Sequence, residues 1–381
     1  TEMLKLVLGT SGSGKTTLLY ARIRARAEAG KRSILLVPEQ FTSSTEARIY
    51  RELGDALSGM VESYSFTSLA EHILAALGGA AVQTLTDAGR AVLVRRALEE
   101  LQDNVHYYYR HRRSAAFCQM AAETIDELKS AGLSGQQLQE LARDCGTESA
   151  KLGELALIFQ GYESLLAGTG MDPADRLELA ADRLEAALAR DELPDFLRER
   201  EVFIDEFDTF NAPKKRLMGA MLAALPAVTV ALCEDGAPMQ PGDLELFSGA
   251  KQVAAQLRQL ARKNGAQVAA PELLRRDLRH KEAPGLAALT ELLETGSCTP
   301  PESAPELRLF AAASREEEAR CAAAAIRRLM RQGVRCGKIA VVCRDISLYR
   351  AAVRYEFRMA EIPLYCDEPT TPEFSAPATA V

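Results

Sequence analysis

The sequence predicts an α/β protein built on a parallel β-sheet, and three observations support this fold class. Short apolar runs typical of buried strands alternate with stretches of helical periodicity. The first run, Leu4–Leu8, leads through a glycine-rich loop into an amphipathic stretch from Thr17 to Ala29. A long block without strand character then interrupts the alternation, which resumes near residue 201. We therefore expect a parallel sheet domain with an all-α insertion.

The predicted strands of this first domain are short and rich in apolar residues. They are Leu4–Leu8, Ser33–Val37, Val61–Phe66, Glu201–Phe207 and Ala227–Leu232. Gly30 occupies the position after a helix where a left-handed residue commonly ends it. Because helical stretches separate the strands, crossover connections predict that they run parallel.

The interrupting block, from Thr86 to about Arg200, shows helical periodicity only. Its apolar residues recur at helix spacing, as in Ile158, Tyr162 and Leu165, which indicates helical core rather than a cofactor site. Asp172 followed by Pro173 predicts a helix start, with aspartate as the N-cap and proline in the first turn.

A second α/β unit is expected after a linker at 296–304. Leu307–Phe310 and Lys338–Cys343 read as strands, and Ser314 with Glu317 predicts a capping box for a helix that ends near Gly333. The expected organisation is a first domain from residues 1–80 and 200–295, a helical insertion at 81–199, a partial second domain at 305–366, and a poorly ordered tail at 367–381.

Composition narrows the class of protein. The 381 residues are 47% hydrophobic and 26% charged, as in ordinary globular proteins, and the net charge of −7 disfavours a general polyanion-coating protein while allowing a local basic groove. Eight scattered cysteines without metal-ligand spacing indicate free thiols in a reducing compartment. No apolar run approaches the ~20 residues of a membrane span, so we expect a cytoplasmic protein without a membrane segment.

The glycine-rich loop has the pattern G-x-x-x-x-G-K-T, which is typical of a phosphate-binding P-loop. Its residues are Gly9, Thr10, Ser11, Gly12, Ser13, Gly14, Lys15 and Thr16. The glycines let successive N–H groups point at one anion, and the following helix contributes the positive end of its dipole. Lys15 is predicted to reach the β- and γ-phosphates of ATP, and Thr16 to bind Mg²⁺. The alternative is a glycine-rich turn before a capped helix.

An acidic pair follows the apolar run Val202–Ile204. Asp205, at the end of a buried strand, is predicted to contact Mg²⁺, and Glu206 to orient or deprotonate the attacking water. The alternative is a solvated acidic turn. The order of phosphate loop, helical block, acidic strand, linker and second α/β unit suits a nucleic-acid motor built from two RecA-like domains.

Several segments resemble known helicases. Val202–Phe210 (VFIDEFDTF) resembles motif II of superfamily-one helicases of the UvrD/RecB type, and Ser65–Ala70 (SFTSLA) resembles their Ib-type segment. Together with GTSGSGKT, LLVPEQFT and the helix SREEEARCAAAAIRRLM, these segments resemble the AddB family, also called RexB. The resemblance extends to about residue 365, which corresponds to the N-terminal third of a full-length member.

The resemblance implies the helicase-like part of the B subunit of the bacterial AddAB ATP-dependent helicase–nuclease. This complex processes double-strand DNA ends for recombinational repair. The implied partners are an AddA-type subunit in a heterodimer, single-stranded DNA and duplex ends, and the implied cofactors are ATP and Mg²⁺. The nuclease domain and the iron–sulfur cluster of the family belong to the C-terminal part, beyond residue 381.

The resemblance also assigns residues. Gly9, Gly14, Lys15 and Thr16 match the phosphate loop, and Asp205 and Glu206 match the metal and water positions. Arg344 resembles the motif IV arginine that approaches the γ-phosphate, although an ordinary surface arginine at a strand end is an equal alternative. Tyr64, Phe66 and Thr67 match single-stranded DNA contacts.

The resemblance implies a degenerate motor, and two departures from active helicases argue against coupling between ATP and DNA movement. Asp208 stands where a glutamine is usual after motif II, and Cys233–Gly236 (CEDG) replaces a Gly-Asp-x-x-Gln motif. Whether this part of the protein hydrolyses ATP is left open by the sequence. Two other functions stay open, a free-standing P-loop ATPase or small-molecule kinase with a helical lid, and a structural subunit with a vestigial P-loop.

One further tract, His106–Arg113 (HYYYRHRR), interleaves aromatic and basic residues. Bases of single-stranded DNA stack on tyrosines in such tracts while arginines meet phosphates. The alternative is a solvated linker whose tyrosines pack on neighbouring helices.

Overall fold

The computed structural model describes residues 3–81, 83–238 and 246–366. The chain divides into two compact units, Thr1–Cys298 and Thr299–Val381. The predicted tail at 367–381 lies outside the described residues. Within the described part of the chain, no helix combines the length and apolar character that a membrane crossing requires.

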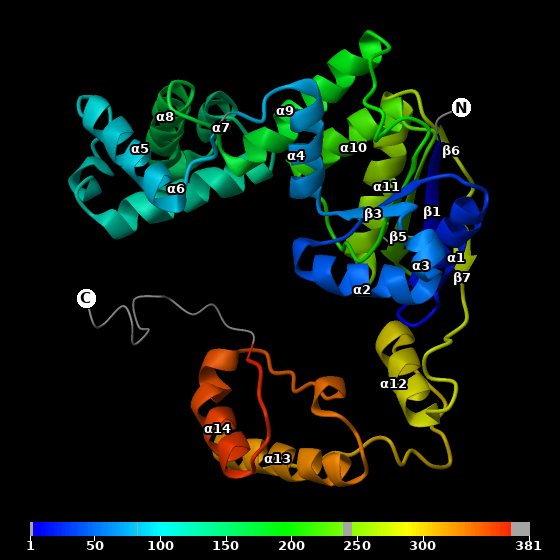
Figure 1. The fold of residues 1–381 in the computed structure, drawn as a ribbon. Helices are drawn as coiled ribbons and strands as arrows, with labels where there is room; N and C mark the ends of the chain where they lie inside the picture. Colours follow the sequence, from blue (N-terminus) through cyan, green and yellow to red (C-terminus); the bar gives the residue numbers. More distant parts are fainter. Residues whose placement is uncertain (1–2, 82, 239–245, 367–381) are drawn as a thin grey trace. The chain divides into compact units, whose positions relative to one another are not determined.

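The first unit is built on a seven-stranded parallel sheet, which confirms the predicted α/β fold class (Figure 1). Its strands are β1 (Met3–Gly9), β2 (Ser33–Leu36), β3 (Val61–Tyr64), β4 (Glu201–Ile204), β5 (Ala227–Cys233), β6 (Gln267–Val268) and β7 (Glu272–Leu274). They are ordered β3-β2-β4-β5-β1-β6, with β7 also paired to β1. The strands β6 and β7 are not among the predicted strands.

The register aligns the carboxyl ends of these strands along one edge of the sheet. Gly9 of β1 lies opposite Cys233 of β5, while Leu36 of β2 lies opposite both Ile204 of β4 and Tyr64 of β3. In parallel α/β sheets, the loops that leave this edge build ligand sites. The fold therefore brings the phosphate loop and the acidic pair to the same edge.

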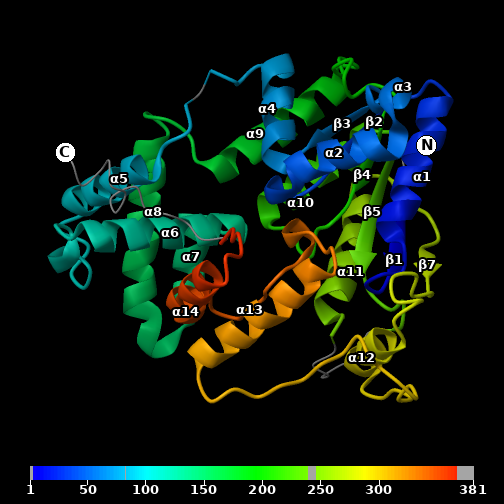
Figure 2. The ribbon, with the colours of Figure 1, turned by 60° about the horizontal axis from the view of Figure 1, so that its bottom comes forward.

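Helices cover both faces of the sheet, because side chains alternate along each strand (Figure 2). On one face, α1 (Lys15–Glu28), α2 (Thr42–Leu53) and α3 (Asp55–Ser58) cover a core that includes Val7, Leu35 and Phe203. The other face packs against α4 (Phe66–Leu77), α9 (Pro173–Ala189), α10 (Ala212–Ala224) and α11 (Ser248–Lys263).

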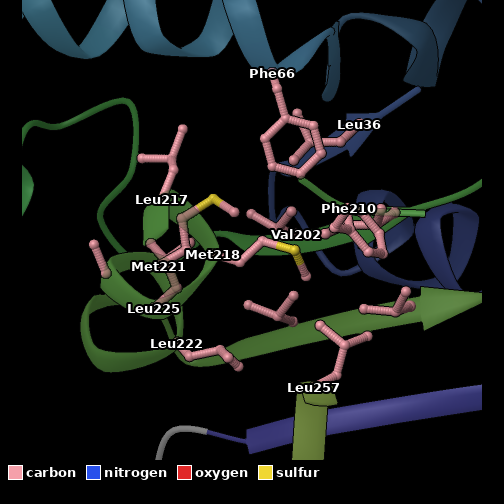
Figure 3. Packing of buried hydrophobic residues seen from close by; sticks show 14 of the residues in the cluster. Leu36, Phe66, Val202, Phe210, Leu217, Met218, Met221, Leu222, Leu225 and Leu257 are labelled. Atoms are coloured by element: carbon pink, nitrogen blue, oxygen red, sulfur yellow. The ribbon is translucent and has the colours of Figure 1, made fainter. Parts of the chain in front are cut away.

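The core on this second face, part of which Figure 3 shows, contains more buried residues than the core on the first face. Phe66 of α4 packs edge-to-face against Phe207 and Phe210, with ring centroids 5.3 and 6.0 Å away. Such aromatic pairs contribute roughly 1 kcal/mol each beyond the area that they bury. Phe66 therefore helps to fix the segment after Glu206 onto the sheet.

The helical block forms its own core within the first unit. Its further helices are α5 (Asp87–Glu100), α6 (Ala115–Ser130), α7 (Gly135–Ala142) and α8 (Ser149–Leu166). Val94, Leu98, Ile125, Phe159 and Tyr162 are all buried in this core. As predicted, α9 follows Asp172 with proline in its first turn. Since residues 1–298 form one compact unit, the boundaries at 81 and 199 remain a prediction.

In its described residues, the second unit has two α-helices that pack together, α13 (Arg315–Arg331) and α14 (Ile346–Met359). Ser314 accepts a hydrogen bond from the Glu317 N–H (3.3 Å), but the Glu317 carboxylate accepts from the Ala313 N–H (2.8 Å) rather than from the N-cap residue. The predicted capping box is thus only half formed. Gly333, with φ 89°, follows the end of α13 as expected.

The two strands predicted for the second unit are not formed in the described residues. The segments at 307–310 and 338–343 carry no strand hydrogen bonding, and the side chains of Leu309 and Val342 are 101% and 90% exposed. An apolar extended segment becomes a strand only when a neighbour satisfies its backbone groups. The local pattern was therefore insufficient to predict strand pairing here.

The first unit also contains α12 (Pro284–Thr295), which follows β7 after a nine-residue loop at 275–283. Leu289, Leu292 and Leu293 on this helix are exposed. The loop that precedes α12 contributes to the site described below.

Candidate nucleotide site

The phosphate loop connects β1 to α1 and needs glycine for two reasons. Gly12 and Gly14 have φ angles of 80° and 91°, in the left-handed region that favours glycine. At Gly9 the reason is space, because a Cβ atom there would lie 2.4 Å from Ser13 Oγ. These conformations let the backbone curl before α1 begins at Lys15.

The loop holds the functional groups that an anion requires. Lys15 Nζ donates to the carbonyl oxygens of Gly9 (2.8 Å) and Thr10 (2.9 Å). Burial lowers the pKa of Lys15, although the nearby Cys233 and Asp205 oppose this shift. Ser13 Oγ is buried and has no hydrogen-bond partner among the described residues. A buried hydroxyl without a partner beside a basic group is suited to an anionic ligand.

The acidic pair lies at the end of β4. The Asp205 N–H donates to the Leu36 carbonyl (3.1 Å), and the Asp205 carboxylate accepts from the Glu206 N–H (3.0 Å). Asp205 is buried, whereas Glu206 has φ 66°, an uncommon conformation for a residue with a side chain. Strained backbone of this kind clusters at functional sites.

The strands that lead to Lys15 and to Asp205 lie in the same sheet but are not neighbours, because β5 lies between β1 and β4. The two segments nevertheless meet at one cavity of about 640 Å³, which is lined by Thr16, Asp205 and Glu206 among others. Partial burial at this cavity and the charge of Asp205 raise the pKa of Glu206. The structure thus brings both predicted magnesium ligands and the predicted base to one space.

A third segment contacts the phosphate loop and was missed by the sequence reasoning. The Leu278 N–H donates to the Gly12 carbonyl (2.9 Å), and Arg279 Nη1 donates to Ser11 Oγ (3.1 Å). Asp277 fixes this turn by accepting from the backbone N–H groups of Arg279 and His280. The signal in the sequence was a pair of leucines, Leu273 and Leu274, at the start of a basic stretch, LRRDLRHK.

Two departures noted in the sequence have distinct surroundings. Asp208 lines the same cavity as Asp205. Asp235 forms an ion pair with Lys251 of α11 (2.8 Å), and this contact lowers the pKa of Asp235 although its burial opposes the shift. The Asp235 carboxylate is therefore engaged in this ion pair and is not free. Arg344 is an exposed residue of the second unit, so its predicted approach to a γ-phosphate stays a prediction.

The three predicted DNA residues differ in accessibility. Thr67 is exposed, and Tyr64 is half-buried with its hydroxyl donating to Glu62 (2.7 Å). Burial and Glu62 raise the pKa of Tyr64 to about 12. Phe66 is only 2% exposed and belongs to the core. A base has no exposed face of Phe66 to stack on, so the DNA hypothesis for this segment depends on Tyr64 and Thr67.

The aromatic and basic tract in the helical block forms a packed turn. The Glu154 carboxylate accepts from the backbone N–H groups of Tyr107 and Tyr108, at distances from 2.9 to 3.2 Å. Tyr108 stacks on Phe117, and the Arg112 guanidinium lies 3.9 Å from the ring centroid of Tyr109. These contacts favour the structural alternative for the tract.

Comparison with known proteins gives consistent matches. Residues 6–290 match the family described as "ADDB, N-terminal". Proteins described as the B subunit of an ATP-dependent helicase/deoxyribonuclease are similar to this chain, with 34% identity over 381 residues for Desulforudis audaxviator, 33% over 379 for Moorella thermoacetica and 32% over 390 for Symbiobacterium thermophilum. These matches cover 96 or 97% of this chain and 32% of each relative. The chain therefore spans about a third of the length of these relatives.

Proposed function

The chain belongs to the family of AddB N-terminal regions, and from this premise we propose that it is the nucleotide-binding, helicase-like part of the B subunit of an ATP-dependent helicase/deoxyribonuclease. In this role it binds Mg-ATP and single-stranded DNA during the processing of double-strand breaks. The family membership confirms the resemblance drawn from the sequence. The observation that carries the proposal is the shared cavity of Thr16, Asp205 and Glu206.

The phosphate groups of ATP would bind at the curled loop. The backbone N–H groups at the start of α1 and the dipole of that helix attract anions. Lys15 would exchange its two carbonyl contacts for phosphate oxygens, and the unpartnered Ser13 hydroxyl would gain a partner. Arg279, which already contacts Ser11, adds a second positive charge beside the loop.

The magnesium ion would be held by the Thr16 hydroxyl and the Asp205 carboxylate, oxygen ligands of the kind that Mg²⁺ prefers. When bound, the ion neutralises charge on the phosphate oxygens. Glu206 is then the candidate base, because its raised pKa makes it a better proton acceptor for a water molecule at the cavity. We propose that turnover is slow, since Asp208 replaces the glutamine of active helicases and Asp235 is held by Lys251.

The helical block supports this reading over a small-molecule kinase with a helical lid. A lid would have to cover the phosphate loop, which leads into α1 on one face of the sheet. The helix α9, the last helix of the block, packs on α4 and α10 on the other face. The AddA-type partner subunit, the binding of duplex ends and the cytoplasmic location remain parts of the proposal.

Calorimetry with Mg-ATP tests the nucleotide proposal. The Lys15→Ala variant should weaken binding by about 10- to 100-fold, because a charged hydrogen bond to phosphate is lost. Lys31→Ala, which removes an exposed lysine after α1, is the matched control and should change the affinity less than about two-fold. Equal affinity of the Lys15→Ala variant and the wild-type chain would exclude the phosphate loop as the binding site.

Titration with single-stranded DNA tests the proposed binding of DNA. Affinity for a labelled oligonucleotide should fall steeply with added salt, because phosphate contacts release counterions. A Thr67→Glu variant places a negative charge at the exposed start of α4 and should weaken binding further. The absence of binding at low salt would remove DNA from the proposal for this part of the protein.

A further inference from the structure

Arg48 of α2 faces the nucleotide cavity and has no role in the proposal above. It lines the same cavity as Thr16, Asp205 and Glu206. Its Nε atom is buried and has no hydrogen-bond partner among the described residues. Nor does the described part of the chain offer it a carboxylate within ion-pair distance. Arg48 as a whole is half-buried, but a buried nitrogen without a partner is costly, and an anionic ligand would satisfy it.

Tyr20 holds the guanidinium in this position. Arg48 Cζ lies 5.0 Å from the centroid of the Tyr20 ring, a distance typical of a cation–π contact. Tyr20 is itself only 6% exposed and stands one helical turn after Thr16 on α1. The ring therefore positions the arginine on the side of α1 that also presents the predicted magnesium ligand.

The charges that face Arg48 come from several elements. Asp205, Glu206 and Asp208 line the cavity from the segment after β4, and Arg51 lines it from the next turn of α2. The charge of Arg48 opposes the burial and the Asp205 charge that raise the pKa of Glu206. The guanidinium is thus near the candidate base without being paired to it.

We propose that Arg48 binds the γ-phosphate of ATP and so makes the site discriminate ATP from ADP. This inference rests on the proposed nucleotide site. The phosphate loop and Arg279 would contact the nucleotide from one side, whereas Arg48 lies on α2 and lines the cavity that Thr16 and Asp205 also line. Its contact is therefore expected with the terminal phosphate, which ADP lacks.

The test compares a non-hydrolysable ATP analogue, AMP-PNP, with ADP, each with Mg²⁺, by calorimetry on this chain. Arg48→Met removes the charge but keeps an unbranched stem against Tyr20. This variant should weaken the binding of AMP-PNP by about 10- to 100-fold and the binding of ADP by less than about three-fold. The unchanged affinity for ADP also shows that the variant is folded. Arg48→Lys restores a charge without the planar fork and should give an intermediate ratio.

Arg51→Met is the matched control, because Arg51 lies on the same helix and wall but is 70% exposed. It should leave the ratio of AMP-PNP to ADP affinity within about two-fold of the wild type. If Arg48→Met leaves the ratio of AMP-PNP to ADP affinity unchanged, the inference is overturned. An equal loss of affinity for both nucleotides would also overturn it, because that result indicates a structural role. A selective loss of single-stranded DNA binding would instead assign Arg48 to a DNA phosphate.

The inference and the proposed function fail in different ways. If the wild-type chain binds neither nucleotide, both are overturned. If the wild-type chain binds both and Lys15→Ala loses both, the nucleotide site stands whatever Arg48→Met does. The ratio measured for Arg48→Met then decides the inference alone.

Discussion

The helical region and the phosphate loop of the first unit both hold polar and charged groups that are shielded from solvent, but the two regions give these groups different partners. In the helical region, Lys129 Nζ lies 2.8 Å from carboxylate oxygens of both Asp172 and Asp175, and the Tyr162 hydroxyl donates to Asp172 (2.7 Å). At the phosphate loop, Ser13 Oγ is buried with no hydrogen-bond partner among the described residues. In the part of the chain that the structure describes, the Lys15 ammonium donates only to backbone carbonyl oxygens.

The pKa values of the two lysines follow this difference. Burial alone would lower the pKa of Lys129, but its hydrogen bonds to Asp172 and Asp175 raise it. Burial lowers the pKa of Lys15, where the nearby Asp205 only partly opposes the effect. Removing a charge from a buried ion pair is costly because its partners stay buried, whereas the half-buried Lys15 has no such carboxylate partner among the described residues and is a candidate to bind a ligand.

The largest effect on stability is expected at Lys129. Lys129→Met leaves the Asp172 and Asp175 carboxylates beside an apolar side chain and should lower the free energy of unfolding by roughly 3–5 kcal/mol, measured by urea denaturation. Lys151→Met is the control, because Lys151 and its partner Glu148 are 41% and 58% exposed. That variant should lose less than about 1 kcal/mol. Equal stability of the two variants would contradict the comparison.

A smaller effect of opposite sign is expected at Glu206. Its φ of 66° suits glycine, so Glu206→Gly should raise the free energy of unfolding by about 1 kcal/mol relative to Glu206→Gln. Both variants should lose ATP turnover, because neither retains the carboxylate. If Glu206→Gly proves less stable than Glu206→Gln, the backbone at this residue is not strained.

The smallest effect concerns pH. Partial burial and Asp205 raise the pKa of Glu206, so the folded state holds this proton more tightly than the unfolded state. The resulting stability is fully present below the ordinary pKa of glutamate and is lost as the pH rises through the raised pKa. The free energy of unfolding of the wild-type chain, minus that of Glu206→Gln, should therefore fall as the pH rises between these two pKa values. Urea denaturation at a series of pH values measures this difference. A difference that rises with pH would contradict the assigned direction.

The phosphate loop and the acidic pair were predictable because their chemistry is local. The glycine pattern between a strand and a helix determines the backbone conformation at Gly9–Thr16. Asp205 follows an apolar run whose composition predicts a buried strand. The helix α13, with Ser314 before it and Gly333 after it, was predictable for the same reason. Each of these features depends on residues within a few positions of one another.

Other parts of the site depend on contacts between distant segments. Arg279 reaches Ser11 only because β7 pairs with β1, and a three-residue strand carries little signal of its own. Phe66 looked like a DNA contact at a strand end, but Phe207 and Phe210 enclose it. Arg48 gave no sequence signal, because a single arginine on an amphipathic helix usually faces solvent.

By itself, the sequence determined the parallel α/β class, the curled loop at Gly9–Thr16, the acidic pair at the end of its strand and the helical character of the long insertion. Periodicity and backbone preference are properties of neighbouring residues, so they can be read along the chain. Only the tertiary structure decided that β5 separates β1 from β4, that Arg279 and Arg48 join the site, and that 307–310 remains unpaired. Strand order and burial depend on which distant segments meet, and no local pattern encodes that choice.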